Sequence, residues 1–271
     1  MALTKVLIAV KTYPTISAKY DELVCTAGFR EDGSWIRIYP VPFRKKAYTE
    51  QYKKYDWIEL DLVKNDGDFR PESHRPYSHD SEIKIVGHID TAGNWAERKQ
   101  LVLGKIYYSL AELIAEAKDK NICTSLAVFK PTRILDFKAE LVNREWSKDK
   151  LAKLQQLNLF DTATAEGKFE VVRKLPYKFT YILTDNQGKE SRMMIEDWEI
   201  GQLYWNCLAR HEGNEAKAVA DVKNKYFEDF SKTKDLYLFL GTTQVHHYVS
   251  HNPFIIIGTF HPKKETQTSL F

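Results

Sequence analysis

The chain has 271 residues, with 40 basic and 37 acidic side chains and a net charge of +3 at neutral pH. This weak surplus permits nucleic-acid binding but excludes the strongly cationic composition of a protein that coats phosphate backbones. The three cysteines are far apart and form no CxxC pair, which disfavours a disulfide framework and a zinc knuckle and favours a reducing cytoplasm. The length suits one large domain or two ordinary ones.

The N-terminal segment predicts a first strand, because its apolar run at 6–10 is too short for a signal peptide or a membrane span. The other long apolar run, 253–260, is also too short, so we expect no membrane partner. Further short, alternating segments predict strands in the N-terminal lobe, residues 1–98, at 22–29, 34–43, 56–63 and 82–89. Such a set is typical of a small OB-like barrel. The segment 64–81 predicts a long loop.

Apolar residues at helical spacing predict a helix over 99–124 that bridges two lobes. In the C-terminal lobe, 125–262, we expect a hairpin turning at 186–188, helices near 198–211 and 215–230, and closing strands at 235–243 and 253–260. Residues 263–271 predict a flexible tail. The expected fold class is α+β, with two β-rich OB-like barrel lobes joined and flanked by helices.

Aromatic and basic side chains interleave on the strand at 35–39, where Trp35, Arg37 and Tyr39 share one face. Rings that stack on bases and cations that contact phosphates are the components of a groove for single-stranded nucleic acid. The alternative is that this face, or the face of Ile36 and Ile38, fills the core. The predicted binding set also includes other basic side chains of the same lobe: Arg30, Arg44, Lys45, Lys46, Arg70 and Arg75.

Histidines gather near the C-terminus, at 246, 247, 251 and 261. His246 and His247 are adjacent and would point to opposite faces of a strand, and no acid lies in their loop to complete a metal site. We therefore predict that His246, His247 and His251 contact phosphates or bases. No P-loop, GxGxxG, GxSxG or HExxH pattern occurs, and we expect neither a metal nor a cofactor.

Acids at the start of the helix near 198 have two interpretations. Glu196, Asp197 and Glu199 suit the partial positive charge of a helix N-terminus. Alternatively, Asp185, Glu196 and Asp197 converge with the histidines at 246–261 into the site of a metal-dependent nuclease or a nucleotide-processing enzyme. The spatial distribution of these acids and histidines distinguishes the enzyme from a binding module.

The last five residues, Gln-Thr-Ser-Leu-Phe at 267–271, resemble the bacterial peptide that binds the DNA sliding clamp. Gln267, Leu270 and Phe271 occupy the fixed positions of that peptide, and the two apolar side chains would enter a pocket of the clamp. The alternative is that they fold back onto the chain itself. A second match at 156–160 has its own alternative as the end of an amphipathic helix.

The stretch ELVCTAGFREDGSWIRIYPVPF at 22–43 resembles the opening of uncharacterised prokaryotic proteins described as dual OB-fold domain proteins. The resemblance covers about the first ninety residues specifically. It implies two OB-like barrels and association with nucleic acid, in DNA repair or in defence against foreign DNA, and it implies no catalytic residues. We therefore expect a cytoplasmic accessory protein that binds single-stranded or structured nucleic acid and that its tail recruits to the sliding clamp.

Overall fold

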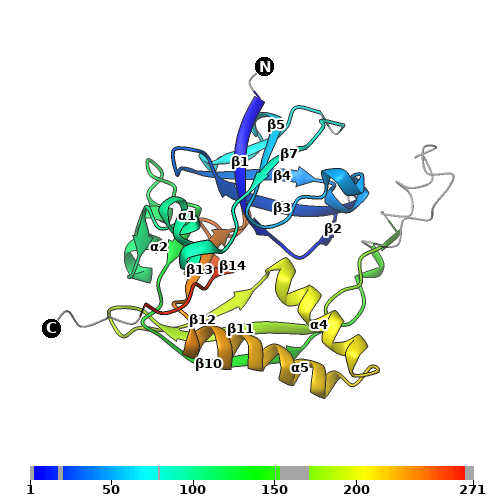
Figure 1. Ribbon diagram of the computed structural model, residues 1–271, viewed down its shortest axis with the longest axis vertical. Coiled ribbons are helices and arrows are strands. Elements are labelled where there is room, and N and C mark those ends of the chain that lie inside the picture. Colours follow the sequence, from blue (N-terminus) through cyan, green and yellow to red (C-terminus); the bar gives the residue numbers. More distant parts are fainter. Residues whose placement is uncertain (1–2, 18–20, 79, 150, 153–170, 266–271) are drawn as a thin grey trace.

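The computed structural model describes residues 3–17, 21–78, 80–149, 151–152 and 171–265. Two β-sheets form two lobes, with helices beside and between them, and Figure 1 shows the strands β13 and β14 of the second sheet lying against the first lobe. The predicted α+β class with two β-rich lobes is confirmed. None of the helices in the described ranges is both long enough and apolar enough to span a bilayer.

The first lobe is a closed barrel. Its strands are β1 (Leu3–Lys11), β2 (Thr15–Ser17), β3 (Asp21–Phe29), β4 (Trp35–Val41), β5 (Asp56–Lys64), β6 (Ser73–Pro76) and β7 (Lys84–His88). Neighbouring strands pair in the order β1-β3-β4-β6-β5, and β5 pairs again with β1, which closes the ring. Only β4 and β6 run parallel within that ring. Alternate residues such as Ile36, Ile38, Ile58 and Leu60 fill the interior.

The prediction of an unbroken loop over 64–81 was wrong. Residues of β6 pair with β4 at Arg37 and Ile38 and with β5 at Val63 and its neighbours, so this segment supplies the strand that closes the barrel. The predicted strand at 82–89 forms β7 instead, which pairs with β5 alone and is exposed along its length. Pairing between distant segments, which leaves no local pattern, decides this outcome.

The prediction of one bridging helix over 99–124 was also wrong. Helix α1 (Ala92–Val102) ends before Gly104, the short strand β8 (Ile106–Tyr107) follows, and a second helix α2 (Leu110–Lys118) begins at its cap Ser109. Strand β8 joins the edge of the second sheet by pairing with β9. Hydrogen bonds to that sheet therefore interrupt a segment whose apolar spacing is helical.

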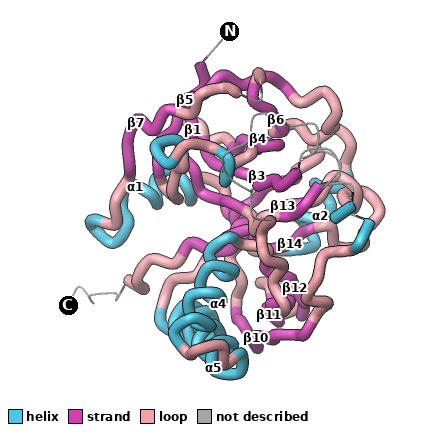
Figure 2. Tube along the Cα trace, turned by 90° about the vertical axis from the view of Figure 1, so that its right-hand side faces the viewer, coloured by secondary structure: helices cyan, strands magenta, loops and turns pink. Residues whose placement is uncertain are grey.

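The second lobe is one mixed sheet covered by helices on one face. Its remaining strands are β9 (Leu126–Phe129), β10 (Arg133–Leu141), β11 (Tyr177–Thr184), β12 (Glu190–Ile195), β13 (Tyr237–Thr242) and β14 (Phe254–Phe260), in the order β10-β11-β12-β14-β13-β9-β8. Figure 2 shows α4 (Trp198–Arg210) and α5 (Glu215–Lys223) along this sheet, and a π-helical segment, Asn224–Ser231, continues α5. The predicted hairpin, helices and closing strands of this lobe are confirmed.

Apolar contacts join the lobes. A buried cluster combines Leu7 and Phe29 of the barrel with Val128, Phe239 and Phe260 of the second sheet. Burial of so many large side chains between the lobes makes them one packed body rather than two units on a flexible linker.

Candidate nucleic-acid interface

A groove of about 630 Å³ lies between the barrel and helix α4. We call it the inter-lobe groove. The side chains on its walls are aromatic, amide, basic or small, and the lining residues are Tyr13, Phe43, Arg44, Gln51, Val171, Val172, Arg173, Trp198, Gln202, Trp205, Asn206 and Ala209. Residues from the first lobe and from the second lobe therefore face each other across it, and neither lobe forms the groove alone.

Helix α4 presents two different faces. Ile200, Tyr204 and Cys207 are buried against the second sheet. Trp198 and Trp205 lie seven positions apart on the groove side, which places both rings on one stripe of the helix. Gln202, Asn206 and Ala209 belong to the same stripe and are exposed. The helix thus buries one face and offers rings and amides on the other.

Tyr13 connects the two walls of the groove. Its hydroxyl accepts a hydrogen bond of 2.8 Å from the indole N–H of Trp205 and donates one of 2.8 Å to the carbonyl oxygen of Arg173. The guanidinium of Arg173 lies 4.1 Å from the centre of the Trp205 ring, which is cation–π distance. A Cβ atom at Gly201 would lie 2.2 Å from the Tyr13 ring, so the absence of a side chain there lets Tyr13 pack on α4.

A half-buried cation lies beside two of the aromatic rings that line the groove. The Lys11 ammonium lies 4.3 Å from the ring centre of Phe43 and 5.1 Å from that of Trp198, and it donates to the carbonyl oxygen of Tyr52. Burial lowers the pKa of Lys11 to about 8, although the Glu199 carboxylate opposes the shift. Near neutral pH the ammonium is still mostly protonated, so it adds positive charge beneath the aromatic rings.

An ion-pair network with a buried core fixes the start of α4. Asp197 caps the helix by accepting from the backbone N–H of Glu199. Lys54 of the barrel lies 3.3 Å from Asp197 and 2.7 Å from Glu199. Burial opposes the charge on Lys54, but the two carboxylates outweigh it and raise the lysine's pKa. This network holds Trp198, which lies between the two acids in sequence, against the barrel.

Three of the predicted binding residues lie inside the fold. Arg37 is 2% exposed, and its guanidinium donates to the hydroxyl and the carbonyl oxygen of Ser125 in the second lobe. Arg70 is 6% exposed and forms an ion pair with Asp68. His247 is fully buried, with one ring nitrogen 2.8 Å from the Ala117 carbonyl oxygen. The polar groups of these three side chains bond within the protein. The side chains have too little accessible surface to contact a nucleic-acid strand.

Two of the predicted residues, Arg30 and Trp35, line a separate cavity of about 350 Å³ beside Tyr107. The Trp35 ring packs 4.0 Å, centre to centre, from Phe29, so it serves the core as well as this cavity. Tyr39 is half-buried on the same strand. The interleaved strand face therefore splits between core and surface rather than forming one binding groove.

The other basic and histidine residues of the predicted set are spread over the surface. Arg75 is exposed on β6, and His246 and His251 are exposed in the turn between β13 and β14. Because they lie on different elements from the inter-lobe groove and line none of its walls, the structure does not bring them together with Arg44.

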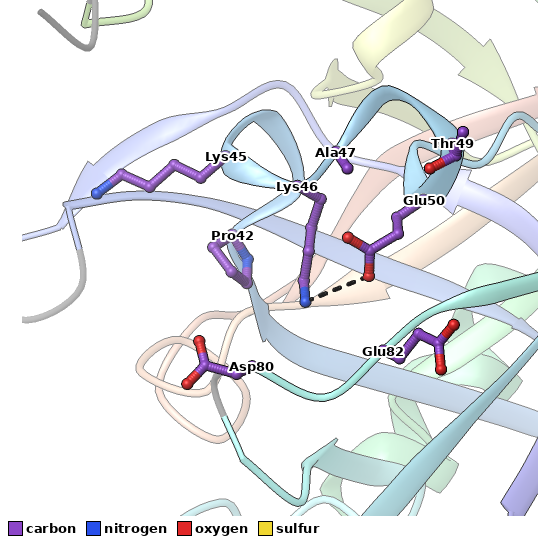
Figure 3. A pocket seen from close by; sticks show the side chains of 8 residues that line it. All are labelled: Pro42, Lys45, Lys46, Ala47, Thr49, Glu50, Asp80 and Glu82. Carbon is purple, nitrogen blue, oxygen red and sulfur yellow. Dashed lines mark ion pairs between the residues drawn. The ribbon is translucent and has the colours of Figure 1, made fainter. Parts of the chain in front are cut away.

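The predicted basic run at 44–46 divides between two hollows. Arg44, in the short 3-10 helix Phe43–Lys45, lines the inter-lobe groove. Lys45 and Lys46 line a neighbouring hollow of about 570 Å³, shown in Figure 3, whose other charged residues are Glu50, Asp80 and Glu82. The Lys46 ammonium lies 3.6 Å from the Glu50 carboxylate. Acids outnumber bases in this hollow, so it suits phosphates less well than the groove does.

The acids and histidines of the enzyme alternative do not gather into one site, although His261 lines a cavity together with Glu199. Asp185 is buried and accepts hydrogen bonds from the backbone N–H groups of Leu110, Gln187 and Lys189. Asp197 is engaged by Lys54. Among the described residues, no group of three or more His, Cys, Asp or Glu side chains has the arrangement of a metal site.

The two peptides that resemble clamp-binding motifs, 156–160 and 267–271, lie outside the described residues. The recruitment hypothesis therefore stays a prediction from the sequence.

Sequence reasoning missed most of the groove, including Tyr13, Arg173, Trp198, Gln202 and Trp205. One signal was available in WEIGQLYWNCLAR, where both tryptophans fall outside the apolar stripe formed by Ile200, Tyr204 and Cys207. No local signal places Tyr13 or Arg173 beside that helix. Tyr13 lies 192 positions before Trp205, and 160 positions separate Tyr13 from Arg173.

Comparison with known families matches both halves of the chain. Residues 2–104 match the family model described as "Domain of unknown function (DUF8758)", and residues 106–271 match "Domain of unknown function (DUF8757)". The second match covers more than half of the sequence, and the chain belongs to that family.

No curated protein matches the chain. One solved structure, described as "Structure of murine DNA binding protein bound with ds DNA", has 10% identity and a TM-score of 0.33, with 99% of this chain and 100% of that chain covered. A likeness this low supports no inference about function.

Proposed function

We propose that this chain binds single-stranded nucleic acid, or the unpaired loops of structured nucleic acid, in the inter-lobe groove. The observation that carries the proposal is the arrangement of Tyr13, Trp198 and Trp205 with Arg44 and Arg173 around one cavity. Aromatic faces accept bases of any sequence, and arginines beside them contact the phosphates that link those bases.

Each group in the groove has a distinct task. Trp198 and Trp205 are about 10 Å apart along the helix axis, at a rise of about 1.5 Å per residue, so they would contact different bases of one strand. The exposed amides of Gln202 and Asn206 can both donate to and accept from base edges, which unpaired bases present. Arg44 and Arg173 lie on opposite walls and would hold the backbone between the lobes.

The groove favours unpaired strands over duplexes for a physical reason. Bases reach an aromatic ring face to face only when they leave their own stack, which costs little in a single strand and several kcal/mol in a duplex. A groove of about 630 Å³ also holds a few nucleotides rather than a double helix.

Electrophoretic mobility of labelled DNA and RNA strands, single and duplex, with and without magnesium, tests the proposal. We expect single strands to shift and to remain intact, with quenching of tryptophan fluorescence as bases stack. Equal affinity for blunt duplex and single strand would overturn the stacking model. Strands shortened only with magnesium would favour the nuclease alternative.

We also propose, from the sequence alone, that the tail brings the protein to replicating DNA. Gln267, Leu270 and Phe271 match the fixed positions of the clamp-binding peptide. A role in DNA repair or in defence against foreign DNA is consistent with such recruitment. Binding of the full chain to purified bacterial sliding clamp, lost when Leu270 and Phe271 are both changed to alanine, is the expected result. A clamp that ignores the intact chain would remove this part of the proposal.

A further inference from the structure

A cationic hollow of about 230 Å³ lies in the second lobe, where β10 and β13 begin and the chain leaves β14. We call it the Lys130 hollow. Four basic side chains and one acid line it, and these are Lys130, Arg133, Lys234, Lys264 and Asp235. The excess of three positive charges is larger than that of the inter-lobe groove, which is lined by two arginines and no acid.

Ion pairs within the fold occupy only part of this charge. One carboxylate oxygen of Asp235 accepts from Lys130, and the other accepts from the hydroxyl of Tyr237. Lys234 lies 3.5 Å from Asp229, which is not part of the lining. These contacts account for two of the four bases.

The other two bases are accessible and lack an acidic partner. Arg133 and Lys264 are exposed, and neither is paired with a carboxylate in the part of the chain that the structure describes. The Lys264 ammonium donates to the carbonyl oxygen of Lys232, which leaves its other N–H groups for a ligand. Thr132 is also exposed and adds a hydroxyl to the lining. Arginine, lysine and threonine side chains are typical contacts of phosphate oxygens.

The hollow differs from the groove in having no ring for a base. None of the described residues that line it is aromatic, whereas Trp198 and Trp205 line the groove. In a duplex the bases are stacked inside and the phosphates face outward, so cations without rings suit a paired segment.

The length of β11 separates the hollow from the groove. Arg133 pairs with Thr184 at the end of β11, and Arg173 of the groove lies shortly before Tyr177, where that strand begins. Figure 1 likewise shows the described C-terminal end and helix α4 on opposite sides of the second lobe. The eight residues of β11 span roughly 26 Å, at about 3.3 Å per residue. This is the length of about eight base pairs, at about 3.4 Å per pair.

We propose that the Lys130 hollow holds the phosphate backbone of a paired segment whose unpaired continuation lies in the inter-lobe groove. This inference rests on the proposed function of the groove, and it makes the preferred ligand a junction of duplex and single strand. Thr132, Arg133 and Lys264 contact phosphates of the duplex, and Lys130 and Lys234 strengthen the positive potential around them. A blunt duplex reaches the hollow alone and binds weakly.

Fluorescence anisotropy with three labelled ligands tests this site. They are a short single strand, a blunt duplex longer than the spacing between the two sites, and the same duplex carrying the strand as an overhang of either polarity. We expect one junction to bind at least about fivefold more tightly than the single strand near 0.15 M salt, because it adds phosphate contacts. Equal affinities for the junctions and the single strand would overturn the proposal.

A double variant removes the two accessible cations. Arg133→Gln with Lys264→Gln should abolish the preference for the junction and leave the affinity for the single strand unchanged. It should also reduce the slope of log K against log salt for the junction by about 1.8, at about 0.9 for each lost contact. Lys178→Gln with Arg192→Gln is the matched control, since both cations pair with Glu140 on the same sheet. An equal loss in the control, or no loss in the double variant, would contradict the assignment.

Failure of this proposal is distinguishable from failure of the groove proposal. If the groove holds no strand, Trp205→Ala leaves single-strand binding unchanged, whereas the double variant still lowers the salt slope of the blunt duplex. If the hollow holds no duplex, Trp205→Ala still weakens single-strand binding, but the junction has no advantage. Binding of polyglutamate that the double variant loses, without a preference for the junction, would assign the hollow to an acidic protein segment and overturn this proposal.

Discussion

The indole N–H of Trp205 donates a hydrogen bond of 2.8 Å to the hydroxyl of Tyr13, which joins helix α4 of the second lobe to the first lobe. The same hydroxyl donates to the carbonyl oxygen of Arg173. Three groups of the inter-lobe groove are therefore held by one oxygen atom. A groove ordered in this way before its ligand arrives loses little conformational entropy on binding.

Replacing Trp205 tests the stacking role. Base–aromatic stacking contributes about 1–3 kcal/mol per base, so Trp205→Ala should weaken single-strand binding roughly 5- to 150-fold. Trp205→Phe keeps a ring and should retain most of the affinity. Fluorescence anisotropy with a labelled oligonucleotide measures both. Trp57→Ala, on a barrel strand away from the groove, is the control, and wild-type affinity in a folded Trp205→Ala protein would contradict the model.

Replacing Arg173 tests phosphate contact. If its guanidinium neutralises one phosphate, Arg173→Gln should weaken binding of all sequences alike and reduce the slope of log K against log salt by about 0.7. Titrations at four salt concentrations give that slope. Arg192→Gln makes the same charge change at an exposed ion pair with Glu140 on the second sheet, and it should leave the slope unaltered. A common slope for both variants would argue against Arg173 as a phosphate ligand.

Gly201 and Tyr13 should show coupled effects on stability. Gly201→Ala places a methyl group against the Tyr13 ring and should lower the free energy of unfolding by about 1–3 kcal/mol. In a Tyr13→Ala background the ring is absent, and the same change should stabilise the helix by up to about 1 kcal/mol. Urea unfolding of the four proteins measures this reversal of sign. If the effects of the two substitutions on the free energy of unfolding are additive, the packing of the Tyr13 ring does not require a glycine at position 201.

His261 should make the fold sensitive to acid. It stacks 3.8 Å, centre to centre, on Phe230, and burial lowers its pKa from 6.5 to about 4. As the pH falls from 6.5 to 4, the unfolded chain takes up a proton that the folded chain does not, so stability decreases by up to about 1.4 kcal/mol per pH unit from this group.

His261→Phe should remove that part of the pH dependence. Asp197, whose pKa burial raises, acts in the opposite direction, but it is present in both proteins and largely cancels in their difference. Thermal unfolding at pH 4.5, 5.5 and 7 gives the comparison. A difference between variant and wild type that does not change with pH would show that His261 titrates normally in the folded protein.

Local patterns predicted the elements whose contacts are local. The hairpin of β11 and β12, the helices α4 and α5, and the strands β13 and β14 all follow from turn residues and side-chain periodicity. The same reasoning failed at β6, whose sequence is typical of a loop. This segment forms a strand because it pairs with β4, with Ser73 opposite Arg37 and His74 opposite Ile38. It failed again between α1 and α2, where pairing of β8 with β9 interrupts a helical pattern.

The residues predicted to form the binding groove are not the residues that the structure brings together in the inter-lobe groove, apart from Arg44. Aromatic and basic side chains were expected to form a groove on the strand at 35–39, yet Arg37 bonds to Ser125 and lies in the interior. Alternation along a strand shows which residues share a face, but which face another lobe covers depends on packing.

By itself, the sequence determined the class of this protein: an α+β chain with two β-rich lobes, aromatic rings to stack, and a small surplus of cations. Only the tertiary structure decided which rings and cations meet. Tyr13, Arg44, Arg173 and Trp205 come from distant segments, and the packing of α4 against the barrel, fixed by the buried ions Lys54 and Asp197, brings them to one groove. Such convergence depends on the whole fold, because the local sequence around each residue does not predict which distant residues it will lie beside.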